Sequence, residues 1–162
     1  MIESKYLTDS VQNIQKLMTI APLRKFETRY LGQLIRLSKI REYEHGELII
    51  TEGGQDTWIY FLLSGKVRIE KKGMEIAIID NVGEIFGEMR MLDGLARSAS
   101  VYAEGKTVCL AFDPYGEDSL SSPDQRTKFL LLLYKMFAEF LSSRLRVIND
   151  ELSRIKKETG KR

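Results

Sequence analysis

The fold of this chain is indicated first by one stretch, Gly83-Glu84-Ile85-Phe86-Gly87-Glu88-Met89-Arg90-Met91-Leu92-Asp93-Gly94-Leu95-Ala96-Arg97-Ser98-Ala99-Ser100-Val101. Residues 88–92 favour helix and their neighbours favour strand, so we predict one helical turn, beginning at Gly87, that interrupts a sheet. The free N–H groups and the dipole at the start of that turn favour an anion. Arg97 can hold two phosphate oxygens at once, and the Ser98 hydroxyl and Ala99 amide add donors. The stretch therefore predicts an anion site.

Glu88 is the unusual residue of this stretch, because a carboxylate is repelled by a phosphate beside it. A carboxylate in such a pocket needs a donor, and a hydroxyl pair or an internal basic group is the usual one. A sugar 2′-hydroxyl bound by Glu88, with a phosphate held by Arg97 on the opposite side, satisfies both demands. The alternative is an internal salt bridge from Arg97 to Glu88 or Glu84.

Outward from this stretch, residues 41–121 have the pattern of a β-roll. Short runs rich in β-branched and aromatic residues alternate with glycines, and no long amphipathic helix separates them. This pattern predicts an antiparallel sandwich or jelly roll, hence a mainly β fold. We expect strands at 47–51, 58–63, 66–71, 75–79, 98–103 and 107–112.

Helices are expected on both sides of the roll. Residues 1–40 have apolar residues at helical spacing, and Pro22 separates two helices there. Ser122-Pro123-Asp124 combines an N-cap residue, a proline at the first helical position and an acid in the first turn. We therefore predict a long helix over 122–158, because nothing stops it before Gly160, and a tail over 159–162.

The long helix carries two apolar patterns. Residues 129–141 are nearly all apolar, which predicts burial on all sides. The stripe that follows has spacings typical of a coiled coil and consists of Leu141, Leu145, Ile148, Leu152 and Ile155. We expect a parallel homodimer through residues 129–155. The alternative is a helix that lies back along its own sheet.

Composition excludes several classes of site and partner. A chain of 162 residues with 43% hydrophobic content forms one domain, or one domain plus a long appendage, and a net charge of +2 gives little steering toward nucleic acid. The basic tail after Ser142 is interpreted as a solvated helix end, so direct DNA binding is not expected. One cysteine (Cys109, expected buried) and one histidine (His45, expected in a surface turn) are too few to build a Cys/His zinc site, and we expect no metal. The absence of a signal peptide and of long apolar runs predicts a soluble, cytoplasmic protein without membrane contact.

Phe86-Gly87-Glu88 followed by Arg97-Ser98-Ala99 resembles the phosphate-binding cassette of the cyclic nucleotide-binding domain family. The resemblance extends to Gly46-Glu47-Leu48-Ile49, to Glu52-Gly53-Gly54, to Ser64-Gly65-Lys66-Val67 and to the helix after Pro123, about residues 23 to 155 in all. It implies an eight-stranded β-roll (a double-stranded β-helix) with flanking helices, like the sensor domain of catabolite activator-type regulators. No helix-turn-helix segment follows the stripe, so a stand-alone sensor domain is expected.

The resemblance also implies roles for ten residues. Glu88 binds the ribose 2′-hydroxyl, Arg97 binds the cyclic phosphate, and the remaining phosphate contacts come from amides near Gly87, Met89, Ser98 and Ala99. Four residues are expected near the purine base: Val67, Ile69, Arg144 and Asn149, the last from either subunit.

The sequence and the resemblance together predict a non-enzymatic sensor of a cyclic nucleotide, cAMP in preference to cGMP, that signals through its C-terminal helix to an unknown protein effector. The alternative is an interaction or assembly module of the same fold that no longer binds nucleotide. Arg90 is the departure that favours the alternative, since the family carries a small residue there. We expect its side chain to point to solvent or across the mouth of the pocket.

Overall fold

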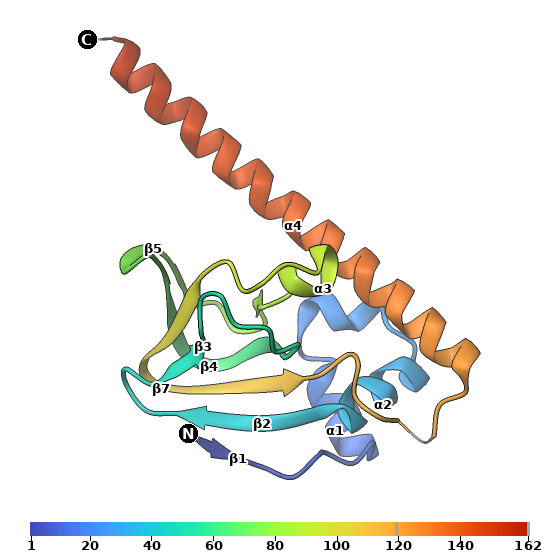
Figure 1. Cartoon of the computed structure of the whole chain (residues 1–162). Helices are drawn as coiled ribbons and strands as arrows, with labels where there is room; N and C mark the ends of the chain where they lie inside the picture. The colour runs from blue at the N-terminus through green and yellow to red at the C-terminus, as the bar shows by residue number, and fades with distance from the viewer. Residues whose placement is uncertain (119, 162) are drawn as a thin grey trace.

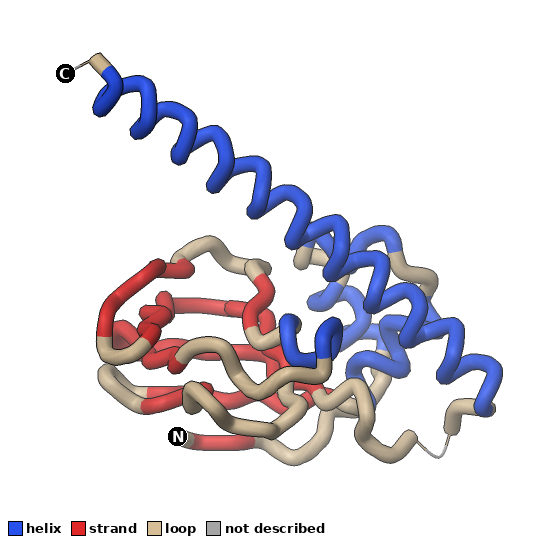
Figure 2. The backbone as a smooth tube through the Cα atoms, turned by 45° about the horizontal axis from the view of Figure 1, so that its top comes forward, coloured by secondary structure: helices blue, strands red, loops and turns tan. Residues whose placement is uncertain are grey.

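The sheet is antiparallel throughout in the computed structural model, which describes residues 1–118 and 120–161. Within these residues seven strands form one sheet that does not close on itself. Its main path runs in the order β1 (Ile2–Glu3), β2 (Ser38–Tyr43), β7 (Ser100–Phe112), β4 (Ile59–Lys71), β5 (Met74–Ile79), while β3 (Leu48–Ile50) pairs with β7 and β6 (Ile85–Phe86) pairs with β4. The strands gather on one side of the molecule and the short helices on the other (Figures 1 and 2). The predicted β-roll is confirmed, although seven strands form it within the described residues where the resemblance implied eight.

Two long strands replace four of the predicted short ones. β4 continues through Gly65 and β7 continues through Gly105, where turns between separate strands were predicted. Both glycines adopt positive φ, 81° and 76° respectively, and the register of β4 against β7 shifts between Leu62 and Lys66. Such bulges bend a strand without ending it. The prediction of separate strands was wrong because a glycine with positive φ serves a bulge as well as a turn.

The helices before the roll end earlier than predicted. They are α1 (Val11–Leu17), the 3₁₀ helix η1 (Ala21–Lys25), which contains Pro22, and α2 (Thr28–Arg36). Helix was predicted as far as Ile40, but Ser38–Tyr43 pairs with β7 along its whole length. Pairing with a distant strand therefore overrides the local helical pattern here.

The long helix α4 (Pro123–Gly160) begins where its capping signal predicts. Ser122 is the N-cap, and it forms a capping box with Gln125. Phe129, Leu133, Met136 and Phe137 form the buried face of the first half. The prediction that this half is buried on all sides was wrong: Leu131 is 62% exposed and Tyr134 37%. Only one face of this half of the helix packs on the domain, so the apolar residues on its other faces remain exposed.

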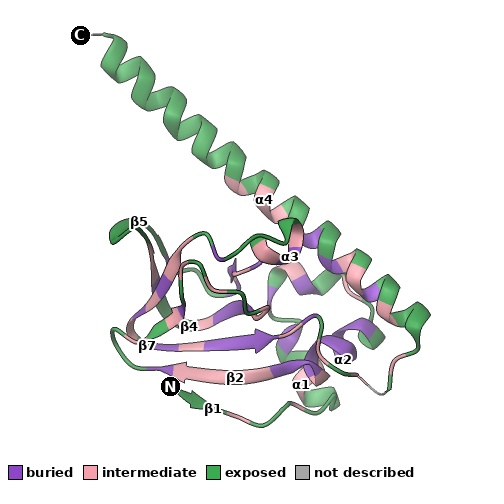
Figure 3. Cartoon of the chain, viewed as in Figure 1, coloured by how far each residue is buried: buried purple, intermediate pink, exposed green. Residues whose placement is uncertain are grey.

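The second half of α4 leaves the domain and is exposed (Figure 3). Leu145, Ile148, Leu152 and Ile155 of the heptad stripe are between 48% and 58% exposed. Residues 129–141, the first part of the predicted dimer region, therefore pack one face on their own domain. The exposed stripe lies farther along the helix. Within the described residues, no helix is both long enough and apolar enough to cross a membrane.

Two apolar cores lie on opposite faces of the β4 and β7 pair. Phe61 and Phe112 point to a core shared with the helices, which includes Phe137 of α4. Tyr60 and Cys109 point to the inside of the roll. Alternation along the strands places one core against the helices and the other inside the roll. The burial of Cys109 and the exposure of His45 agree with the sequence predictions.

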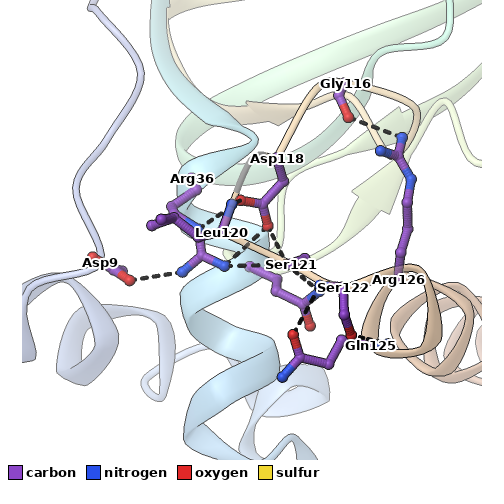
Figure 4. A network of polar contacts seen from close by, with 10 residues as sticks. Asp9, Arg36, Gly116, Asp118, Leu120, Ser121, Ser122, Gln125 and Arg126 are labelled. Carbon is purple, nitrogen blue, oxygen red and sulfur yellow. Dashed lines mark hydrogen bonds and ion pairs between the residues drawn. The ribbon is translucent and has the colours of Figure 1, made fainter.

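A polar network fixes the start of α4 against α2 (Figure 4). Arg36 donates to both carboxylate oxygens of Asp118 at 2.9 Å and to Asp9 at 2.7 Å. Burial opposes ionisation of Asp118, but hydrogen bonds from Arg36 and Ser121 outweigh it and lower the pKa of Asp118. Arg126 of α4 donates to the carbonyl oxygen of Gly116 at 2.9 Å. The first turn of α4 is thereby tied to the segment that follows β7.

Candidate functional site

Gly87 lies where β6 ends and the short helix α3 (Met89–Asp93) begins. Its φ is +84°, and a Cβ there would lie 3.0 Å from Nη1 of Arg97 and 3.1 Å from the carbonyl oxygen of Trp58. Both the backbone conformation and the space therefore require glycine. The predicted helical turn inside the sheet is present, and it begins beside Arg97.

Arg97 is 6% exposed and is fixed by four hydrogen bonds. Nε and Nη2 donate to the Asp56 carboxylate at 3.3 and 2.6 Å, Nη1 donates to the Gly87 carbonyl at 2.7 Å and Nη2 to the Trp58 carbonyl at 2.6 Å. Four of the five N–H groups of the guanidinium are thus used. The sequence alternative placed this salt bridge at Glu88 or Glu84, whereas its partner is Asp56.

The backbone of Arg97 is clamped as well as its side chain. The N–H of Gly53 donates to the Arg97 carbonyl at 2.8 Å, and the N–H of Arg97 donates to the Gly54 carbonyl at 2.9 Å. A Cβ at Gly54 would lie 2.9 Å from the carbonyl oxygen of Thr51. The turn at Gly53-Gly54 therefore holds the backbone of Arg97 in place.

Glu88 is the N-cap residue of α3 and is 2% exposed. Burial raises its pKa, while Arg144 and Arg97 act in the opposite direction. Nη1 of Arg144 lies 3.7 Å from Oε1 of Glu88, which is an ion pair at the outer limit of direct contact. A buried carboxylate with one distant cation retains capacity to accept hydrogen bonds from a bound molecule.

Arg144 connects α4 to this site. Its Nη2 donates to the carbonyl oxygen of Ile85 at 3.0 Å and lies 3.9 Å from Oε1 of Glu84. Its guanidinium stacks over the Phe140 ring at 4.3 Å. A second connection lies nearer the start of the helix, where the Tyr134 hydroxyl donates to the Met91 carbonyl of α3 at 3.2 Å. The cassette is therefore bonded directly to α4 at two levels.

One cavity of about 520 Å³ lies between the roll and α4, and Glu88, Arg97 and Arg144 are among the residues that line it. That volume lies within the usual range for small-molecule sites, about 300–1,000 Å³. Eight of the ten predicted site residues line it: Ile69, Gly87, Glu88, Met89, Arg97, Ser98, Ala99 and Arg144. The structure therefore brings the predicted phosphate and ribose residues together around one space.

The other two predicted residues do not line the cavity. Val67 is fully buried in the core inside the roll, two residues before Ile69 on the same face of β4. Asn149 is exposed on α4, next to Ile148, which does line the cavity. Both were assigned from the family resemblance. Within one chain Ile148, the neighbour of Asn149, lines the cavity, and a contact from Asn149 of a second subunit stays a prediction.

Sequence reasoning missed seven residues that line the cavity: Ile50, Ile76, Phe86, Val101, Leu141, Leu145 and Ile148. Those on strands are apolar residues whose inward direction depends on registers that the sequence does not show. Leu145 and Ile148 were assigned to the dimer stripe alone, yet they also cover the cavity. The heptad spacing could have indicated this contact, because the face of α4 that carries the stripe also faces the cavity at Leu141, Leu145 and Ile148.

Arg90 lines the cavity and runs along α3 toward its C-terminal end. Its Nη1 donates to the carbonyl oxygens of Leu95 at 2.9 Å and Gly94 at 3.4 Å. It is partly buried. The expected placement at the pocket is thus observed, and the side chain is folded back rather than extended into solvent.

Comparison with known proteins identifies the domain. Residues 40–115 match the family described as the cyclic nucleotide-binding domain. Over 72 residues the chain is 35% identical to a cGMP-dependent protein kinase of Eimeria tenella, covering 44% of this chain and 7% of the kinase. Over 75 residues it is 37% identical to the cAMP-dependent protein kinase type II regulatory subunit of Drosophila melanogaster, covering 44% of this chain and 20% of that subunit. The chain thus spans only a small part of the length of these relatives.

The same fold is found in a solved cyclic nucleotide-binding domain from Methylobacillus flagellatus KT. The TM-score is 0.67 at 23% sequence identity, and the match covers 88% of this chain and 82% of that domain. This likeness extends past residues 40–115 and includes the flanking helices. Residues 40–115, which include the roll and the cassette, thus match the cyclic nucleotide-binding domain family, and the solved domain shares the fold of most of the chain.

Proposed function

We propose that this chain is a non-enzymatic receptor for a cyclic nucleotide. One observation carries the proposal: among the described residues, Glu88 and Arg97 are the two charged residues that are buried, and both line the same cavity. Buried charges are retained where they are paired or bind a partner. Arg97 offers a phosphate its remaining N–H group, and Glu88 offers acceptors to a ribose hydroxyl.

The proposed ligand is oriented by these two side chains. The cyclic phosphate lies beside Arg97 and the amides of Ser98 and Ala99, and the ribose lies beside Glu88. The base then extends toward α4, where Ile69, Ile76, Leu145 and Ile148 provide an aliphatic wall. We favour cAMP over cGMP because guanine has more polar edge atoms than adenine, and these lose water against an aliphatic wall without gaining partners.

Ligand binding is proposed to act on α4 through Arg144. The Arg144 guanidinium lies near the Glu88 carboxylate that we assign to the ribose, so a ligand there changes the contacts that hold the helix. Leu145 and Ile148 lie on the same helix and contact the cavity directly. A ligand with different contacts in two helix positions shifts the equilibrium between them. The exposed second half of α4 then presents a changed surface to a second copy of the chain or to a protein effector.

Calorimetry tests the ligand assignment directly. The chain is titrated with cAMP and with cGMP, and the same titrations are repeated on Arg97→Ala and Glu88→Ala. We expect one site per chain at micromolar or lower concentrations for cAMP, weaker binding of cGMP, and loss of binding in both variants. Absence of binding of either nucleotide at these concentrations contradicts the proposal.

One observation favours the second candidate, an interaction module of this fold that does not bind nucleotide. Arg97 already has four internal hydrogen bonds, two of them to Asp56. Thermal melting separates the two candidates, since a ligand at one hundred times its Kd stabilises the folded state by about 2.7 kcal/mol. A melting temperature that does not change at millimolar cAMP and cGMP supports the second candidate.

A further inference from the structure

Arg90 differs from the other two arginines of the cavity in its partners. Arg97 lies 2.6 Å from a carboxylate oxygen of Asp56, and Arg144 lies 3.7 Å from that of Glu88. Among the described residues, Arg90 forms no ion pair, and its Nε is buried without a hydrogen-bond acceptor. The cavity therefore contains one guanidinium whose charge is not balanced by a neighbouring carboxylate.

The position of this guanidinium is fixed by its own element. Nη1 donates to the Leu95 and Gly94 carbonyls at the end of α3, and the side chain forms part of the cavity wall. A buried donor without an acceptor is unfavourable, and the cost is recovered when a partner supplies an oxygen. Nε is therefore a buried donor without a partner, on a side chain that forms part of the cavity wall.

We propose that Arg90 is a second basic ligand-binding residue, which supplies the unbalanced positive charge of the cavity to an anionic ligand oxygen. The inference rests on the proposed function and adds a residue to it: Arg97 is positioned by Asp56, and Arg90 provides the charge that an anionic phosphate neutralises. Guanidinium groups form strong, directed hydrogen bonds to such oxygens. The large residue at this cassette position is thus part of the binding site and does not mark its loss.

The test compares Arg90→Met with a matched control, Arg126→Met. Arg126 is also partly buried and also donates to a loop carbonyl, that of Gly116 at 2.9 Å, but it lies outside the cavity. Methionine keeps most of the side-chain length and removes the charge in both variants. Affinity for cAMP is measured by calorimetry at several salt concentrations, and the ligand-free variants are melted in parallel.

We expect Arg90→Met to weaken cAMP binding about tenfold or more, the usual contribution of a hydrogen bond to a charged group. We also expect its affinity to depend less on salt than that of the unmodified chain, because one cation has been removed. Arg126→Met leaves both quantities unchanged. Wild-type affinity in Arg90→Met overturns the proposal. A weaker affinity with an unchanged salt dependence and a lower ligand-free melting temperature also overturns it, because that result means that Arg90 stabilises the α3 turn and does not bind the ligand. An unmodified chain that binds neither cyclic nucleotide overturns the proposed function itself.

Discussion

Replacing Glu88 by glutamine is expected to stabilise the ligand-free protein while weakening its ligand binding. The carboxylate is 2% exposed, and its nearest ion-pair partner, Arg144, is 3.7 Å away. Burial therefore raises the pKa of Glu88. A carboxyl group with a raised pKa contributes stability that is fully present below its unfolded pKa and is lost as pH rises through the folded value. Glutamine resembles the neutral form and does not lose this stability.

The pH window follows from that sign. The ordinary pKa of this carboxyl is 4.5, so below about pH 4.5 the two proteins should melt at similar temperatures. As pH rises toward neutrality, the melting temperature of Glu88→Gln should exceed that of the unmodified chain by a growing margin. Melting curves between pH 4 and pH 8 measure this difference. A Glu88→Gln protein that is less stable than the unmodified chain at neutral pH refutes the reasoning.

The effect on binding has the opposite direction. A hydrogen bond to a charged group contributes about 1.5–3 kcal/mol, and each 1.4 kcal/mol corresponds to about tenfold in Kd. Loss of the charged acceptor at Glu88 should therefore weaken cAMP binding by roughly 10- to 150-fold. Calorimetry at pH 7 measures it. Because general damage to the fold lowers stability and affinity together, a stabler protein that binds more weakly identifies Glu88 as a ligand residue.

Three further predictions concern the scaffold of the site. Phe137→Ala, on the buried face of α4, should lower the free energy of unfolding in urea by about 3–5 kcal/mol. Leu131→Ala, at a residue that is 62% exposed on the same helix, should change this free energy by less than about 0.5 kcal/mol. Gly65→Ala should destabilise the protein far more than Gly105→Ala in the same assay, because both glycines have positive φ but only at Gly65 would a Cβ clash with backbone, at the carbonyl oxygen of Lys106; equal losses contradict this close contact. Leu152→Glu should convert a dimer into a monomer in sedimentation without lowering the melting temperature of the roll, and an unmodified chain that sediments as a monomer at about 100 µM excludes the dimer.

The sequence predicted best those features that depend on residues close together in the chain. Ser122 and Gln125 form a capping box within one turn, so the start of α4 follows from a few consecutive residues. Gly87, Glu88 and Arg97 lie within one short segment, and their gathering around one cavity follows from a single turn between β6 and α3. Local chemistry determines the start of α4 and keeps Gly87, Glu88 and Arg97 close together, whereas the final position of the Arg97 side chain also depends on Asp56 and Trp58.

The features that sequence missed depend on distant partners. Asp56 pairs with Arg97 across 41 positions of sequence, and no local pattern distinguishes it from a solvated turn acid. Ser38–Tyr43 becomes a strand because β7 pairs with it. Val67 and Ile69 share a strand and a direction of alternation, yet only Ile69 reaches the cavity. The register shifts of β4 near Gly65 are properties of the assembled sheet that no local pattern in the sequence shows.

The central claim is that Glu88 and Arg97 hold one cyclic nucleotide between the roll and α4. It is tested most directly by a crystal structure of the chain grown with saturating cAMP. We predict nucleotide density in the cavity, with a phosphate oxygen within about 3 Å of an Arg97 nitrogen and the ribose 2′-hydroxyl within hydrogen-bond distance of the Glu88 carboxylate. A cavity without nucleotide under these conditions, or a nucleotide bound elsewhere on the chain, contradicts the claim.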